Sequence, residues 1–318
     1  MIVALAGGVG AAKFLSGLVQ RMPQEELTVI VNTGDDAEFY GLHVSPDVDI
    51  IAYTLAGVVE AERGWGVHGD SFACLEALGA FGYETWFQLG DRDLATHIHR
   101  TYLLREGHTL SEITAAIARS LGLHTRLLPM SDQRVVTQIV TPAGTLPFQE
   151  YMVRRRAADP VAGVLFAGAA EAAPAPGVLE AIANAGGVIV GPSNPIISIG
   201  TILAVPGIRA ALRATAAPVV AISPIVARAA LKGPAAEMLR GLGHECSAYG
   251  VAALYRDFVD VFVLDRADAA LSERIAGLGM RVVVANTVMA GPAEKQALAA
   301  VALEALGAPD RLGRAKQG

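Results

Sequence analysis

Cysteine is nearly absent from the sequence, which has only Cys74 and Cys246 among 318 residues. Two thiols so far apart along the chain cannot supply a disulfide framework or a zinc knuckle. Reduced thiols of this kind are typical of a cytosolic protein, so we expect a cytoplasmic location. The N-terminus agrees, because it lacks the basic region and the cleavage-type site of a signal peptide.

Charge is also scarce, at 18% of residues, and 25 Lys and Arg stand against 31 Asp and Glu. A net charge of −6 excludes a general nucleic-acid binder, because no basic surplus exists to neutralise phosphates. The 53% of hydrophobic residues excludes disorder and suffices for a large core. Residues 181–208 carry no charge, but Pro192 and Pro195 interrupt them, so we expect a soluble protein with no membrane partner.

Several catalytic motifs are missing as well. The sequence has no Gly-x-Ser-x-Gly elbow, no Cys–His pair and no His-Glu-x-x-His, so covalent nucleophilic catalysis and zinc hydrolysis lack support. The glycine-rich start is not a complete dinucleotide fingerprint, since Lys13 replaces its third glycine. Asn32, rather than an acid, ends the second apolar run, which argues against an NAD-dependent oxidoreductase.

What the sequence does contain is a series of short runs rich in Val and Ile. None alternates apolar with polar residues, which is typical of strands buried on both faces. The runs cover residues 2–6, 27–31, 163–166, 188–190, 218–222, 259–264 and 281–285. Helical patterns follow or separate them at residues 11–22, 176–185, 268–278 and 292–306. This alternation predicts an α/β fold with a doubly wound, Rossmann-like and mostly parallel sheet.

The middle of the chain has a different pattern. Residues 45–125 are mainly helical and predict an insertion within one α/β domain that spans residues 1–318. Residues 135–141 and 145–153 alternate polar with apolar residues around a Pro-Ala-Gly turn, which predicts a half-exposed antiparallel hairpin.

Small polar residues follow several of the predicted strands. Gly7, Gly8 and Gly10 would let the backbone approach a phosphate at a helix N-terminus, although a plain tight turn explains them equally well. Later strands end near Ser193, Asn194 and Ser223, which offer hydroxyl and amide groups or merely cap helices. Because ligands of open α/β sheets bind at these strand ends, we expect an anionic, nucleotide-like ligand.

Acidic residues gather after the second predicted strand. Asp35 and Asp36 follow it, and Asp47 and Asp49 come soon afterwards. Clustered carboxylates suit Mg²⁺, while the alternative is a turn followed by a helix cap. We interpret Asp47 as a cap and the other three as candidate metal ligands.

Residues 87–97 form the densest polar segment. Asp91 or Asp93 is expected to cap a helix that carries Thr96, His97 and Arg100. Asp93 and His97 are four residues apart and therefore share a helical face. An exposed, capped helix with a salt bridge is the alternative interpretation.

Six segments in order give the sequence a specific resemblance. They are 6–11 (AGGVGA), 31–36 (VNTGDD), 45–49 (SPDVD), 89–97 (LGDRDLATH), 128–132 (LPMSD) and 191–195 (GPSNP). Together they resemble the 2-phospho-L-lactate transferase family of coenzyme F-420 biosynthesis over nearly the whole chain. A sister family, the gluconeogenesis-factor proteins, is similar in its glycine-rich start but is not expected to carry the Gly-Asp-Arg-Asp segment.

The resemblance implies a Mg²⁺-dependent homodimer. The ribityl hydroxyl of the deazaflavin Fo would attack the phosphorus that bears a lactyl or enolpyruvyl group in a guanosine diphosphate donor, releasing GMP. The family's Fo contacts map to Asp49 and to Gln88, where some relatives have a lysine. The assignments that follow are Gly7, Gly8, Gly10, Ser193, Asn194 and Ser223 for the guanosine diphosphate, Asp35, Asp36 and Asp49 for Mg²⁺, and Asp49 as catalytic base.

Two alternative functions stay open at this point, as do the donor's acyl group and the arginine that would bind it. A non-catalytic sugar-nucleotide-binding regulator would use the same sheet without a metal, and an NAD-dependent oxidoreductase would use the same glycines. The acyl group of the donor could be lactate, enolpyruvate or glycerate. Its carboxylate would suit an arginine, and Arg63, Arg92 and Arg134 are equally plausible.

Overall fold

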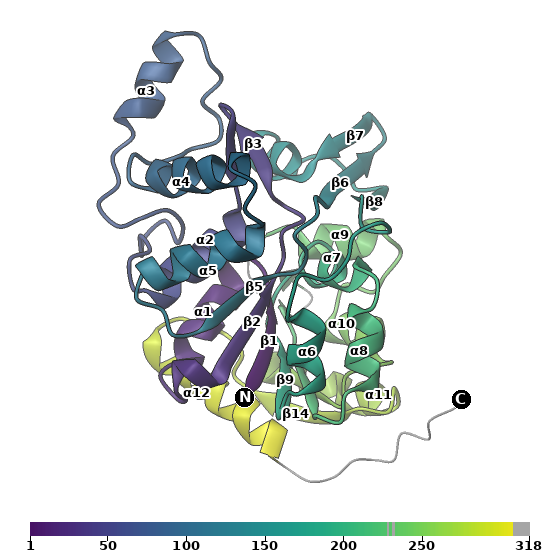
Figure 1. Cartoon of the computed structure of the whole chain (residues 1–318). Coiled ribbons are helices and arrows are strands. Elements are labelled where there is room, and N and C mark those ends of the chain that lie inside the picture. Colours follow the sequence, from purple (N-terminus) through teal and green to yellow (C-terminus); the bar gives the residue numbers. More distant parts are fainter. Residues whose placement is uncertain (228, 231–232, 308–318) are drawn as a thin grey trace.

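A seven-stranded parallel sheet forms the centre of the computed structural model, which describes residues 1–227, 229–230 and 233–307 (Figure 1). The strand order is β14-β13-β10-β9-β1-β2-β5, and every pair of neighbours is parallel. The strands are β1 (Ile2–Ala6), β2 (Leu27–Val31), β5 (Arg126–Pro129), β9 (Gly187–Val190), β10 (Val219–Ile222), β13 (Val261–Asp265) and β14 (Arg281–Ala285). The predicted α/β fold is confirmed.

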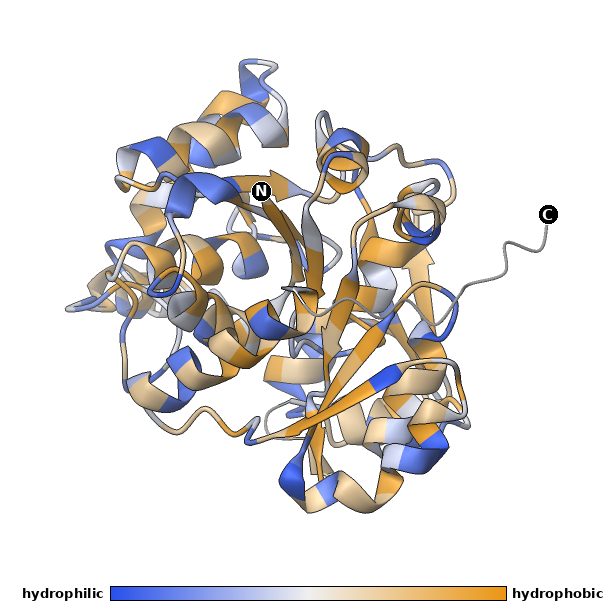
Figure 2. Ribbon diagram, turned by 90° about the horizontal axis from the view of Figure 1, so that it is seen from below, coloured by the Kyte–Doolittle hydropathy of each residue, from blue (hydrophilic) through white to orange (hydrophobic). Residues whose placement is uncertain are grey.

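Successive strand residues point to opposite faces, so each face of the sheet has its own core. In β1, Val3 and Leu5 belong to one hydrophobic cluster, whereas Ala4 and Ala6 belong to the other. Figure 2 shows these hydrophobic strands between helices. The first cluster is covered by α6 (Val178–Ala183), α7 (Ile199–Ala204), α8 (Ile208–Ala214), α9 (Ala235–Gly241), α10 (Ala248–Tyr255) and α11 (Ser272–Ala276). The second is covered mainly by α1 (Gly8–Leu18), α2 (Pro46–Leu55) and α12 (Pro292–Gly307).

One predicted strand belongs to another sheet. The run at 163–166 forms β8 (Gly163–Ala167), which pairs antiparallel with β6 (Val136–Thr141) in a separate three-stranded sheet. The prediction that it is covered on both faces is wrong, since Leu165 is 51% exposed. The third strand of the parallel sheet along the chain is instead β5, a short edge strand that pairs with β2.

The predicted hairpin forms, but its second strand is shorter than expected. Residues of β6 pair antiparallel with β7 (Gly144–Pro147). Pro147 has no N–H to continue the ladder. The chain then coils into a helical turn, Glu150–Arg154, in place of the strand expected to residue 153. The helix predicted at 268–278 is likewise divided, into a 3-10 helix (Arg266–Leu271) and α11.

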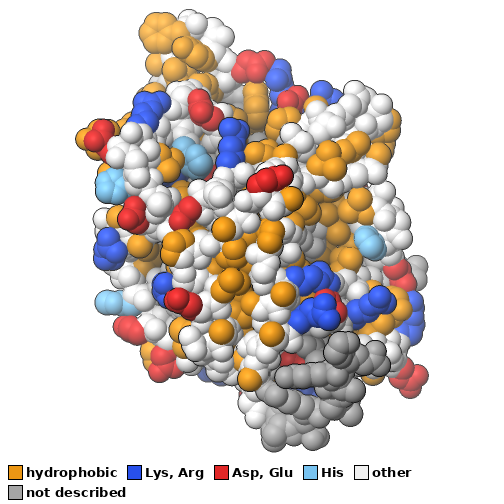
Figure 3. All heavy atoms as spheres, turned by 45° about the vertical axis from the view of Figure 1, so that its right-hand side comes forward, with side chains coloured by type: hydrophobic (Ala, Val, Ile, Leu, Met, Phe, Trp, Pro, Cys, Tyr) orange, Lys and Arg blue, Asp and Glu red, His pale blue; other side chains and the backbone are white. Residues whose placement is uncertain are grey.

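The region 45–125 contains four helices, and their roles differ. Helix α2 packs on α1, whereas α3 (Ala73–Ala80), α4 (Asp93–Arg105) and α5 (Leu110–Ser120) lie further out. A small hairpin, β3 (Ala37–Phe39) and β4 (Leu42–Val44), precedes them. Helix α3 stands at the top of the molecule, where apolar side chains gather on the surface (Figures 1 and 3), and Phe81 at its end is 81% exposed.

The uncharged stretch 181–208 is divided among α6, β9, a loop and α7, with α8 beginning at its end. Among the described residues, none of the helices combines the length and the apolar character needed to cross a bilayer.

Candidate active site

The order of the sheet reverses between β1 and β9, and the loops after these two strands meet there. Successive connections run from β1 towards β5 on one side and from β9 towards β14 on the other. Such a switch point opens a crevice beyond the carboxyl ends of the strands. The N–H of Gly7, after β1, donates to Oγ of Ser193, after β9, at 3.1 Å. This hydrogen bond joins the two loops.

A hollow of about 500 Å³ lies at this junction, and we call it the glycine cavity. Its walls include Gly7, Gly8, Gly10, Ser193 and Asn194. The structure therefore brings together these residues, which the sequence assigned to a nucleotide.

Glycine is required in this loop for close packing. A Cβ on Gly10 would lie 2.6 Å from the carbonyl oxygen of Pro192, and one on Gly7 would lie 2.6 Å from Oδ2 of Asp47. Gly8 has a φ of +71°, in the left-handed region that favours glycine. Close packing and the left-handed turn thus both require glycine in this loop.

Ser223 does not line the glycine cavity. Its Oγ donates to the carbonyl of Ile225 at 2.9 Å and accepts from the N–H of Ile225 at 3.2 Å, so the hydroxyl stabilises a local turn. The neighbouring Pro224 lines the cavity instead.

Asp47 has a different role from the predicted cap. Helix α2 begins after Ser45, and no side chain caps it. Asp47 instead accepts from Nδ2 of Asn32 at 2.9 Å and from the N–H of Gly8. These bonds tie α2 to the ends of β1 and β2. Burial raises the pKa of the Asp47 carboxyl to about 6, against the lowering effect of both hydrogen bonds.

Asp35 and Asp36 lie at the end of β2 with unsatisfied oxygens. Oδ1 of each is buried without a hydrogen-bond partner. Burial raises the pKa of both carboxyls, and the charge of Asp47 raises that of Asp35 further. Asp36 keeps one oxygen bound, 3.0 Å from Nε2 of His43 and 2.6 Å from Oγ of Ser45.

Orphaned carboxylate oxygens that repel one another suit a divalent cation, because an oxygen-seeking ion removes both penalties. The residues at the end of β2 therefore fit Mg²⁺.

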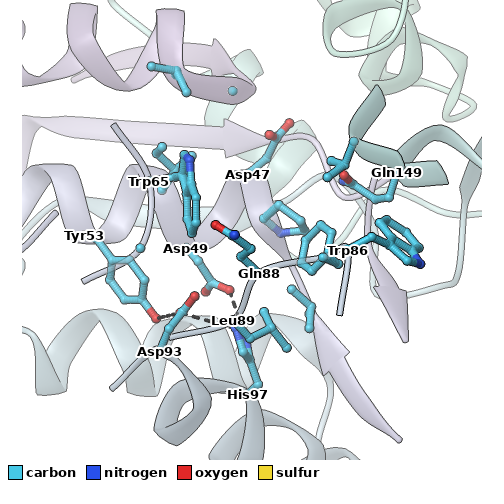
Figure 4. A pocket seen from close by; sticks show the side chains of 18 residues that line it. Asp47, Asp49, Tyr53, Trp65, Trp86, Gln88, Leu89, Asp93, His97 and Gln149 are labelled. Atoms are coloured by element: carbon cyan, nitrogen blue, oxygen red, sulfur yellow. Dashed lines mark hydrogen bonds and ion pairs between the residues drawn. The ribbon is translucent and has the colours of Figure 1, made fainter. Parts of the chain in front are cut away.

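Asp49 lies in a separate buried network. Both of its carboxylate oxygens accept from the guanidinium of Arg100, which has no exposed surface. His97 bridges this pair to Asp93, with Nδ1 3.6 Å from Asp49 and Nε2 3.3 Å from Asp93. Tyr53 donates to Oδ1 of Asp93 at 2.8 Å (Figure 4). The shared face of Asp93 and His97 on α4 is confirmed.

The network also separates the predicted metal ligands. Within the part of the chain that the structure describes, the set of potential ligand atoms lying within 4.8 Å of one another comes from Asp49, Asp93 and His97. Asp35 and Asp36 are not in that set. The sequence could place the three aspartates near one strand end but could not show that α2 turns Asp49 towards α4.

Asp49 and Gln88 line a second hollow of about 320 Å³, which we call the aromatic cavity. Figure 4 shows both side chains directed into it. Its aromatic walls are Tyr53, Trp65, Trp86 and Phe87. Aromatic walls with a few convergent polar groups suit a flat ring system that carries hydroxyls.

The prediction that Asp91 or Asp93 caps α4 is wrong. The side chain of Asp91 accepts from the N–H groups of Ala73 and Cys74 and so holds the start of α3. Asp70, from the preceding loop, accepts from the N–H of Arg92 where α4 begins. Each acid stabilises a segment other than its own, a pairing that local sequence patterns do not reveal.

The glycine cavity and the aromatic cavity adjoin, and they share Gly8, Asp47 and Gln149 among their walls. Gln149 was not predicted. It follows β7, and its Nε2 donates to the carbonyl of Asp35 at 3.1 Å. No sequence signal distinguishes it, because its place depends on the helical turn that replaces the expected strand.

Fold and site together define an α/β protein with a glycine-lined crevice at the switch point of its sheet, beside an aromatic cavity. The chain matches the family model of "2-phospho-L-lactate transferase CofD" over residues 2–301. It is 44% identical over 309 residues to the "Phosphoenolpyruvate transferase" of Streptomyces griseus, covering 95% of this chain and 97% of the relative. It is 39% identical over 304 residues to the "2-phospho-L-lactate transferase" of Methanosarcina mazei, covering 96% and 100%. The chain therefore belongs to the CofD family, as the six segments indicated.

A solved structure of a UPF0052 family protein from Bacillus halodurans superimposes with a TM-score of 0.65, covering 95% of this chain and 99% of that one. The identity is 17%, so this likeness concerns the fold alone.

Proposed function

We propose that the protein transfers a phospholactyl or phosphoenolpyruvyl group from a guanosine diphosphate donor to the ribityl hydroxyl of the deazaflavin Fo. GMP is released, and the product is coenzyme F-420-0 or its dehydro form. The observation that carries this proposal is the shared wall between the glycine cavity and the aromatic cavity, because a nucleotide in the first and a flat acceptor in the second would lie side by side. Family membership favours this reaction over the regulator and the oxidoreductase.

The donor's diphosphate is assigned to the glycine cavity. The N–H groups of Gly7 and Gly8 already bind Ser193 and Asp47, so the donors left for phosphate oxygens are those of the first turn of α1 after Gly8, together with the positive end of the helix dipole. Ser193 and Asn194 line the same cavity. Phosphoryl transfer asks the protein mainly for positioning and for electrostatic stabilisation, which such a loop supplies.

Fo is assigned to the aromatic cavity, where Asp49 and Gln88 would hold its hydroxyl groups. The attacking ribityl oxygen must lose its proton as it bonds to phosphorus. Asp49 is the first candidate to accept this proton. Asp47 is a second, because it lies in the shared wall and burial raises its pKa to about 6.

Asp35 and Asp36 are the proposed Mg²⁺ ligands, on the evidence of their orphaned oxygens. When bound there, Mg²⁺ would neutralise charge on the donor's phosphate oxygens. For Asp49, whose two oxygens both accept from Arg100, we favour orientation of the substrate over metal ligation. We further propose a single domain with the 45–125 insertion, present in the cytoplasm as a homodimer, and light scattering of the purified protein tests the dimer.

A turnover assay tests the function. Purified protein, Fo and Mg²⁺ are mixed with the lactyl or the enolpyruvyl donor, and products are detected by mass. We expect a phosphodiester product from one donor or both, and none in EDTA. Lack of product together with lack of Fo binding would overturn the proposal in favour of the regulator.

Asp49 variants test the assignment of the site. Asp49→Ala should abolish turnover while the guanosine diphosphate still binds, and Asp49→Asn, which keeps the shape of the side chain, guards against misfolding. Asp159→Asn is the matched control, because Asp159 pairs with Arg155 and lines neither cavity. Unimpaired turnover by both Asp49 variants would overturn the assignment.

A further inference from the structure

A third hollow of about 430 Å³ opens beside the other two, and we call it the Arg134 cavity. The residues after β2, the strand β6 and the segment after β7 form its walls. Among the described residues, Arg134 is the only Lys or Arg that lines it, whereas four acidic residues, Asp35, Asp36, Glu38 and Glu150, also line it.

All three cavities meet at one place. The Arg134 cavity shares Asp35, Phe148 and Gln149 with the glycine cavity, and it shares Trp86 and Gln149 with the aromatic cavity. Gln149 therefore lines all three and marks their junction.

The proposed reaction needs three binding regions around the reacting phosphorus, one for each group that meets there. The reacting phosphorus carries the GMP oxygen that leaves, meets the ribityl oxygen that attacks, and keeps its bond to the acyl oxygen throughout. Attack and departure occur roughly in line, so the acyl group must project to the side. With GMP in the glycine cavity and Fo in the aromatic cavity, the Arg134 cavity is the region left for the acyl group.

The three candidate arginines differ in their surroundings. Nη1 of Arg92 donates to the carbonyl of His68 at 2.8 Å, and Arg63 lies 5.3 Å from the ring centres of both Trp65 and Phe72. Neither lines any of the three cavities. Among the described residues, no side-chain hydrogen bond or ion pair occupies the exposed guanidinium of Arg134, so it is available to a ligand.

We propose that the Arg134 cavity binds the donor's acyl group and that Arg134 pairs with its carboxylate. Because the four acidic residues of this cavity would repel a carboxylate, Arg134 is also the group that admits an anion to it. The inference rests on the proposed function, since it assigns one part of the same donor.

The test removes the Arg134 guanidinium and the donor's carboxylate, separately and together, and compares the effects. Steady-state kinetics with Fo and the acyl donor are measured for the wild type, Arg134→Gln, Arg134→Lys and Arg119→Gln. Arg119 is an exposed residue at the end of α5 and lines none of the cavities. An ethyl diphosphoguanosine, which lacks the carboxylate, is used as a competitive inhibitor of each variant.

We expect Arg134→Gln to lower kcat/KM for the acyl donor about ten- to 100-fold, mostly through KM, as expected for a lost charged hydrogen bond. Arg134→Lys should lose less and Arg119→Gln nothing. The Ki of the ethyl analogue should be the same for Arg134→Gln and the wild type. Two results would overturn this inference alone, provided that the wild type is active. One is an unchanged kcat/KM of Arg134→Gln for the acyl donor, and the other is a loss of affinity for the ethyl analogue as large as the loss for the acyl donor. An inactive wild type overturns the proposed function and the inference with it.

Discussion

Arg100 places a full positive charge where no water reaches it. Its guanidinium pairs with both oxygens of Asp49, and its Nη1 also lies 3.3 Å from Nδ1 of His97. A buried ion pair need not stabilise a protein relative to apolar residues, but it leaves an uncompensated charge when one partner is removed. The pair therefore fixes Asp49 in one orientation towards the aromatic cavity.

Removing the guanidinium should be costly for this reason. We expect Arg100→Gln to lower the free energy of unfolding by about 3–5 kcal/mol and to abolish Fo binding. Arg240→Gln is the control, because Arg240 pairs with Glu237 on the surface and should contribute about 1 kcal/mol or less. Urea unfolding of the three proteins measures their stabilities, and titration calorimetry with Fo measures the binding. Equal losses in the two variants would show that Asp49 does not depend on Arg100.

At the scale of elements, the loop after β1 and the start of α1 have almost no room for side chains. We expect Gly10→Ala to weaken GMP binding by about tenfold or more, because its methyl group would lie 2.6 Å from the carbonyl oxygen of Pro192 and push the two loops apart. Gly79→Ala on α3 is the matched control. Its methyl group would lie 3.4 Å from Thr85, and alanine favours the helix.

Titration calorimetry with GMP measures both glycine variants. Gly79→Ala should bind GMP as the wild type does. If Gly10→Ala did the same, the spacing of the two loops would have no part in nucleotide binding.

The elements also show how far the sequence determines the fold. The strands of β1 and β2 could be predicted to the residue, because both faces are buried and the runs are unbroken. The run that forms β8 is similarly apolar but lies in the small antiparallel sheet. Its pairing with β6, and not its composition, places it there. Pairing between distant segments is not encoded in local composition.

The candidate site divides in the same way. Gly7, Ser193 and Gln88 follow motifs and could be placed from sequence. Gln149 and Arg134 could not be placed, because they come to the site through the sheet and the turn around β7 and carry no motif.

Taken as a whole, the molecule buries Asp35, Asp36 and Asp47 at one end of its sheet, and this sets its response to pH. Burial raises the pKa of each carboxyl, that of Asp47 from 3.8 to about 6. Between these two values the folded state holds more protons than the unfolded state. The contribution of the Asp47 carboxyl to the stability of the folded state is therefore fully present below about pH 4 and is lost as the pH rises through about 6.

Asp47→Asn should remove this loss, since the amide does not ionise. In EDTA, we expect the free energy of unfolding of the variant, relative to wild type, to rise by about 2 kcal/mol between pH 4 and pH 7. Urea unfolding across this range measures the difference, and a difference independent of pH would contradict the assignment. Mg²⁺ should stabilise the wild type far more at pH 7 than at pH 4, because only the ionised carboxylates attract it. The charges of Asp35 and Asp36, which also weaken the metal-free fold, are thus the ones proposed to hold the ion.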